Sequence, residues 1–90
     1  MRLGSTKKRF INKSLSDLLK ERIVNIYPAW NKVKAILRDH NVDVEESEWE
    51  FGDCGRLNLN LLDYDSGESF DNCFLVIGWD DGGFHTAYIS

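Results

Sequence analysis

Two cysteines and two histidines supply the side chains in this sequence that are best suited to bind a metal ion: His40, Cys54, Cys73 and His85. Structural zinc sites usually take their ligands in close pairs, because two ligands on one turn already hold two of the bonds in place. No two of these four residues stand close enough in the sequence to share a turn. We therefore expect no metal site and no cofactor.

Cys54 is the candidate nucleophile, because its flanking glycines place it in a turn that could present a thiol. A thiolate is stabilised by nearby cations, whereas Asp53 and the preceding glutamates oppose it. Asp80 and Asp81 could serve in acid–base chemistry, but they fall in a predicted turn and not in an apolar pocket. We expect that the protein is not an enzyme.

The clearest global feature is the separation of charge along the chain. Residues 1–38 contain ten Lys or Arg against two Asp or Glu, and residues 39–90 contain thirteen Asp or Glu against one Arg. The local balances are +8 and −12, and the whole chain carries −4. A concentrated acidic surface speeds association with a basic partner, and bordering aromatic side chains can provide the desolvated contacts that hold it.

We therefore predict a small acidic, non-enzymatic protein-binding module, most concretely an inhibitor or immunity-type protein. Its partner would be a basic protein, and the surface that it occludes could be one that normally binds nucleic acid. The predicted partner-binding residues are carboxylates of the acidic half and aromatic residues close to the last turn: Glu46, Glu48, Glu50, Asp63, Asp65, Trp79, Asp80, Asp81, Phe84 and Tyr88.

Two other functions stay open. The basic residues Lys7, Lys8, Arg9 and Lys13 could neutralise phosphates, which would make the chain a nucleic-acid-binding module. A second apolar sheet face would instead support a homodimer and a structural role. In the simplest alternative, the basic and acidic halves pack beside each other and neutralise their charges.

The elements that position these residues begin with an arm and two helices. Residues 1–12 lack periodicity and are predicted to form a flexible basic arm before a single domain at 13–90. Apolar residues at helical spacing predict a helix over 15–26, and Pro28 separates it from a second helix over 29–39. Asn41 follows as a C-terminal stop signal.

After Val42 the apolar period changes to two, which predicts strands. Residues 48–51 and 57–61 alternate and are predicted to pair as a hairpin, with Trp49 opposite Leu59 and Phe51 opposite Leu57.

A second hairpin is predicted for residues 72–79 and 84–89, because Asp81 and Gly82 suit a two-residue turn. This turn aligns Trp79 with Phe84 and Val76 with Ala87, and both faces of the hairpin are then apolar. Two helices can cover only one face, so we predict an α+β fold, ααββββ, with both helices on one face of a four-stranded antiparallel meander. Part of Leu75, Trp79, Phe84 and Tyr88 is expected to stay exposed on the other face.

The chain of ninety residues fits one domain, and its longest apolar runs of four or five residues fall far short of a membrane span. Residues 1–13 are basic but lead into no apolar segment of the kind found in secretory signals. We therefore expect a cytoplasmic protein with reduced thiols.

Overall fold

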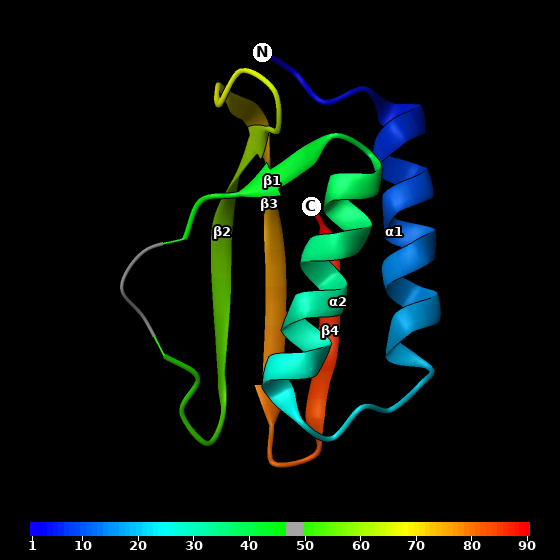
Figure 1. The fold of residues 1–90 in the computed structure, drawn as a ribbon, viewed down its shortest axis with the longest axis vertical. Coiled ribbons are helices and arrows are strands. Elements are labelled where there is room, and N and C mark those ends of the chain that lie inside the picture. The colour runs from blue at the N-terminus through cyan, green and yellow to red at the C-terminus, as the bar shows by residue number, and fades with distance from the viewer. Residues whose placement is uncertain (47–49) are drawn as a thin grey trace.

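The predicted α+β architecture is confirmed in the computed structural model, which describes residues 1–46 and 50–90 (Figure 1). Two helices precede a four-stranded antiparallel sheet with the strand order β1-β2-β3-β4. The elements are α1 Ser5–Leu19, α2 Ile26–Asp39, β1 Val42–Val44, β2 Gly55–Asp63, β3 Ser69–Asp80 and β4 Gly83–Ile89.

Helix α1 begins much earlier than the sequence periodicity predicted. Its buried side chains are Ile11, Leu15 and Leu18, which are spaced by four and three residues and therefore form one stripe. The predicted helix over 15–26 is wrong at both ends, because the stripe extends back to Ile11 and the helix stops at Leu19. Most of the segment predicted to be a flexible arm is therefore helical.

Helix α2 follows the expected break. Pro28 lies in its first turn, where the missing N–H removes no bond within the helix, so the helix begins before the proline at Ile26. At the other end Asn41 has a φ of 62°, a left-handed conformation that stops the helix as predicted.

Strand β1 directly follows this stop and pairs with the far end of β2, where Val44 lies opposite Leu61. The predicted hairpin between 48–51 and 57–61 is wrong for its described part, because Phe51 lies outside any strand and does not pair with Leu57. The predicted partners Glu48 and Trp49 lie outside the described residues. Val42 and Val44 are both buried, which explains why this short segment takes the edge of the sheet.

The β3–β4 hairpin has the predicted turn but a different register. Trp79 pairs with Phe84 as expected, and a bulge next to Gly78 then shifts the register by one residue. Val76 consequently pairs with Tyr88 and not with Ala87, so the predicted faces are wrong. Five side chains from these strands are buried toward the helices and two are exposed on the opposite face: Leu75, Ile77, Trp79, Ala87 and Ile89 against Phe74 and Tyr88.

The helices cover one face of the sheet, with α1 packed along β4 and α2 packed on β1 and β4 (Figure 1). The Asn12 side chain of α1 binds the free edge of β4: its Oδ1 accepts the Ile89 N–H at 2.6 Å and its Nδ2 donates to the Ile89 carbonyl at 3.0 Å. At the opposite end of β4, Gly83 has a φ of 98° and packs against the backbone of Ile23 between the helices. These two contacts fix the helix layer on the sheet.

Candidate functional site

Three separate segments meet at the end of the sheet where α2 begins, at the bottom of Figure 1. They enclose a hollow of about 270 Å³, which we call the acidic groove. Its described lining comes from the α1–α2 connection with the first turn of α2, from the loop before β2, and from the end of β3 with the β3–β4 turn: Val24, Asn25, Ile26, Tyr27, Phe51, Gly52, Asp53, Asp80 and Asp81.

The three walls of the groove are joined by specific contacts. The indole Nε1 of Trp79 donates a hydrogen bond of 3.0 Å to the carbonyl of Gly52, which ties the loop before β2 to β3. Gly83 packs on the backbone of Ile23, which ties the β3–β4 turn to the interhelical connection. The groove is thus held in shape by the fold.

Phe51 fills the space behind the groove with its ring. The centroid of this ring lies 5.0 Å from that of Trp79, 5.3 Å from that of Tyr27 and 5.4 Å from that of Phe84, in edge-to-face geometry. Tyr27 remains 55% exposed and Val24 66% exposed, so the groove has an apolar wall that is open to solvent.

The charge of the groove has one sign. Asp53, Asp80 and Asp81 are exposed, and no lysine or arginine occurs among the described residues that line it. None of the ion pairs within residues 1–46 and 50–90 involves these three carboxylates. Asp80 accepts the Gly82 N–H at 2.8 Å through Oδ1, and its Oδ2 forms no hydrogen bond with the described residues.

A larger hollow, of about 380 Å³, lies between α1 and α2, but its charges are different. Three carboxylates, Asp17, Glu21 and Asp39, and one cation, Lys32, line it. Two of these carboxylates are already paired, Glu21 with Lys32 at 3.3 Å and Asp17 with Lys20 at 3.5 Å. This hollow therefore offers less unpaired negative charge to a partner than the acidic groove does.

No family model matches the chain, and neither does any curated protein or solved structure. The functional argument therefore depends on the residues and their contacts.

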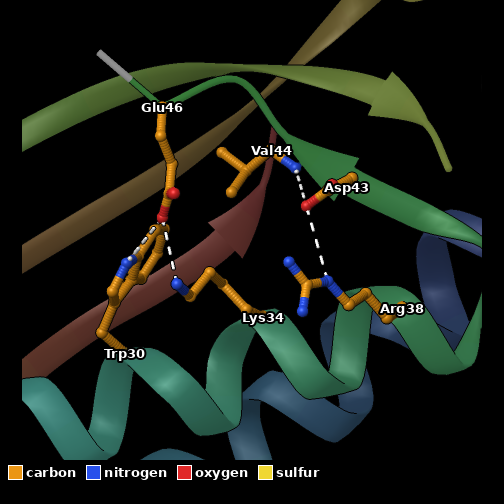
Figure 2. Close-up of polar contacts among 6 residues, drawn as sticks. All are labelled: Trp30, Lys34, Arg38, Asp43, Val44 and Glu46. Carbon is orange, nitrogen blue, oxygen red and sulfur yellow. Dashed lines mark hydrogen bonds and ion pairs between the residues drawn. The ribbon is translucent and has the colours of Figure 1, made fainter. Parts of the chain in front are cut away.

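Glu46, a predicted partner-binding residue, is used within the fold (Figure 2). One of its oxygens accepts the indole N–H of Trp30 at 3.1 Å and lies 3.1 Å from the ammonium of Lys34. One turn further along α2, Arg38 approaches Asp43 of β1 at 3.7 Å. The row of residues four apart on α2 thus neutralises the start of the acidic half, as the simplest alternative from the sequence anticipated.

Asp63 and Asp65 also have internal roles, at the β2–β3 turn. Asp63 accepts the Ser66 N–H at 3.0 Å, and the Asn41 amide donates to Asp65 at 3.0 Å. The hydrogen bonds from Ser66 lower the pKa of Asp63 below its ordinary value, because they stabilise the ionised form. We therefore assign these two residues to the turn.

The predicted aromatic contacts separate into two groups. Trp79 and Phe84 are 5% and 8% exposed and belong to the core with Leu75, so the expectation that these three stay exposed is wrong. The cause is that the helices cover the face on which Trp79 lies together with Leu75 and Ile77, and Phe84 pairs with Trp79 there. Tyr88 is exposed as predicted, but it lies on the open face of the sheet, away from the helices.

The remaining predicted residues occupy several places. Glu50 is exposed beside the groove in sequence, and Glu48 lies outside the described residues. The basic candidates Lys7, Lys8, Arg9 and Lys13 all belong to α1, but successive residues point in directions about 100° apart, so only Arg9 and Lys13 share an exposed side.

The sulfur and imidazole groups form no joint site in the part of the chain that the structure describes. No three His, Cys, Asp or Glu side chains there gather closely enough to hold a metal ion. Cys54 is exposed and Cys73 is buried, and burial raises the pKa of the Cys73 thiol. Among the same residues, no helix has the length and apolar character to span a membrane.

Sequence reasoning missed Tyr27 and Asp53 as groove residues. In the sequence, Tyr27 precedes Pro28 and therefore indicates a helix break. Asp53 precedes Cys54 and therefore indicates a carboxylate that opposes the thiolate. A useful signal was present, since exposed aromatic residues in connections and carboxylates in turns are common in binding sites.

Proposed function

We propose that the protein is a small, non-enzymatic, acidic protein-binding module of the inhibitor or immunity type. Its acidic groove takes a basic segment of the target protein and thereby occludes a cationic surface of that target. The observation that carries this proposal is the group of three carboxylates, Asp53, Asp80 and Asp81, that share a hollow with no cation among its described lining residues.

The chemistry of the groove suits a lysine or arginine side chain. The carboxylates supply hydrogen-bond acceptors and negative charge for the cationic head. Tyr27 and Val24 offer exposed apolar surface for the aliphatic stem, and the tyrosine ring also attracts a guanidinium through its π face. Charge and apolar contact together give both rapid association and a desolvated anchor.

The fixed walls favour binding over catalysis. A groove held by the Trp79–Gly52 hydrogen bond and by the Gly83–Ile23 contact loses little conformational entropy when a partner enters. We place this function in the cytoplasm, where the two free thiols, Cys54 and Cys73, would stay reduced.

The test is a calorimetric titration of the protein with a short arginine-rich peptide, with an equally long glutamate-rich peptide as the reference. We expect binding of the basic peptide only, weakening as salt is added because the charges are exposed. Replacing two groove carboxylates, Asp53→Asn and Asp81→Asn, is expected to weaken binding about tenfold, since exposed charge pairs contribute a few tenths to about 1 kcal/mol each.

The matched control changes the net charge equally at exposed carboxylates outside the groove, as Asp39→Asn with Glu68→Gln. This control protein should bind the peptide almost as tightly as the unchanged chain. Equal losses in the two variants would show that only net charge matters, and the assignment to the groove would then be wrong.

A further inference from the structure

The open face of the sheet, on the side away from the helices, presents an apolar centre within a polar border. Phe74 is 45% exposed and Tyr88 is 38% exposed, whereas Val76, which pairs directly with Tyr88, is only 4% exposed. Asn58 and Asn60 lie beside them on β2. An apolar centre that includes tyrosine and is bordered by amides and an arginine is the usual anatomy of a protein interface.

We propose that this face binds the open face of a second copy of the chain, forming a two-fold symmetric dimer. The proposal is independent of the acidic groove, which lies at the end of the sheet and is built from loops. Its basis is the order of side chains on β2, β3 and β4.

The register defines three rows across these strands. The first row is Arg56, Gly78 and Thr86, the second is Asn58, Val76 and Tyr88, and the third is Asn60, Phe74 and Ser90. In the proposed dimer, the open faces of two copies lie against each other, and the two-fold axis runs between them parallel to the second row. Rotation about this axis places the first row of each copy against the third row of the other.

This arrangement places Phe74 of one copy opposite Gly78 of the other. Gly78 is buried, and the His85 ring and Thr86 lie close to it, so Phe74 would pack on these two side chains. Thr86 would meet Ser90, so hydroxyl groups face each other. Tyr88 lies on the axis and would contact its own counterpart, which is the self-complementarity that a two-fold interface requires.

The charges of the face are also self-complementary. Arg56 is the one cation of residues 39–90, and it donates to the Tyr88 hydroxyl at 3.2 Å without joining any ion pair among the described residues. The Glu45 carboxylate accepts a hydrogen bond of 2.9 Å from the Asn60 side-chain amide, so Glu45 lies beside the third row. The same axis therefore brings Arg56 of each copy toward Glu45 of the other.

The face is large enough for a stable dimer. The molecule measures 35 × 28 × 18 Å, and its broad sides are the helix layer and the open face of the sheet (Figure 1). A standard interface covers about 800 Å² on each partner, which a broad side of these dimensions can supply. Sheets that pack face to face in this way are typically about 10 Å apart.

The test is sedimentation equilibrium of the full chain, where we expect a mass twice the 10.4 kDa of one chain. Phe74→Lys would place two charges within the interface, one on each side of the axis, and it should weaken dimerisation about thirtyfold or more. The matched control is Phe10→Lys on α1, which replaces another exposed phenylalanine on the helix side and should leave the dimer intact. Circular dichroism checks that both variants fold.

A charge exchange tests the axis itself. Arg56→Glu alone should weaken the dimer, because it sets two carboxylates together, and adding Glu45→Arg should restore it. Failure of the double variant to recover would overturn the proposed arrangement. A wild-type mass of one chain at concentrations up to about 1 mM would overturn the dimer and leave the face to a different partner, and equal effects of Phe74→Lys and Phe10→Lys would place the contact elsewhere.

Discussion

Asp63 organises the turn between β2 and β3 through both its backbone and its side chain. Its N–H donates to the Glu68 carbonyl at 2.8 Å, its carbonyl accepts the Gly67 N–H at 2.9 Å, and its carboxylate accepts the Ser66 N–H at 3.0 Å. Gly67 has a φ of 75°, so it supplies the left-handed conformation that the turn needs. The carboxylate thus stabilises a local structure and not a distant partner.

The lowered pKa of Asp63 predicts how this turn responds to acid. A carboxyl whose pKa is lower in the folded state than its ordinary value of 3.8 stabilises the fold above that pH, and this stabilisation is lost as the pH falls through the folded pKa. Asp63→Asn should therefore unfold at a lower urea concentration than wild type at neutral pH. The difference should shrink toward zero near about pH 2.

Asp81→Asn is the control for this experiment, because Asp81 is exposed and forms no ion pair among the described residues. It should change the urea midpoint little at either pH. A difference between Asp63→Asn and wild type that stays constant from neutral to acidic pH would contradict the electrostatic explanation.

At the same scale, the sequence identified many of the chemically important residues but not their surroundings. The predicted turn indicates that Asp80 and Asp81 are exposed to solvent, and in the structure both residues are exposed. Trp79 was assigned to the surface, yet its ring is buried and its Nε1 binds Gly52. The partner of a polar atom depends on a segment that is distant in sequence, which spacing alone does not show.

Among the elements, turns were predicted better than pairings. The prediction of the Asp81–Gly82 turn was correct because two residues determine it, whereas the bulge beside Gly78 has a weaker sequence signal. Gly78 does permit the His85 ring to lie close to the backbone, since an added Cβ would be 3.1 Å from His85 Cε1. A glycine within an apolar strand was therefore a signal that could have been used.

Asn12 shows how α1 protects the free edge of β4. Ile89 directs its N–H and carbonyl away from β3, and the Asn12 amide satisfies both groups, as a neighbouring strand would. Asn12→Ala would leave two backbone groups without these bonds, so the free energy of unfolding should fall by about 1 to 3 kcal/mol. Hydrogen exchange of the Ile89 amide should accelerate more than that of other β4 amides.

Asn31→Ala is the matched control, because Asn31 is exposed on α2 and forms no side-chain hydrogen bond with the described residues. Its free energy of unfolding should stay within about 0.5 kcal/mol of wild type, as is usual for exposed positions. If Asn12→Ala changed the free energy of unfolding as little as this control does, the edge of β4 would not depend on the Asn12 amide.

For the whole molecule, the order of elements could be predicted from the change in apolar period from 3.6 to two near Val42. The acidic groove could not, because its walls come from residues 24–27, 51–53 and 80–81, which only the closing of the helices on the sheet brings together. The separation of charge was visible in the sequence, but only the structure shows that α2 neutralises Asp43 and Glu46 and leaves the carboxylates of the groove unpaired within the described residues.

The contact between Gly83 and Ile23 joins the sheet to the connection between the helices, and it leads to a prediction for both stability and binding. A Cβ at position 83 would overlap the Ile23 carbonyl oxygen, and the φ of 98° is strained for any side chain. Gly83→Ala should therefore lower the free energy of unfolding by about 2 to 4 kcal/mol. It should also separate two walls of the acidic groove and therefore weaken binding of the basic peptide.

Gly82→Ala, one residue earlier in the same turn, separates this tertiary effect from a general effect on the turn. The nearest atom to a Cβ at Gly82 is Oδ1 of the Asp80 side chain, at 3.2 Å, which can move aside at little cost. Chemical denaturation and peptide titration of both variants are the measurements. If Gly82→Ala were as destabilising as Gly83→Ala, the turn itself would be the sensitive element, whereas a loss confined to Gly83→Ala indicates that the packing of the two layers holds the groove together.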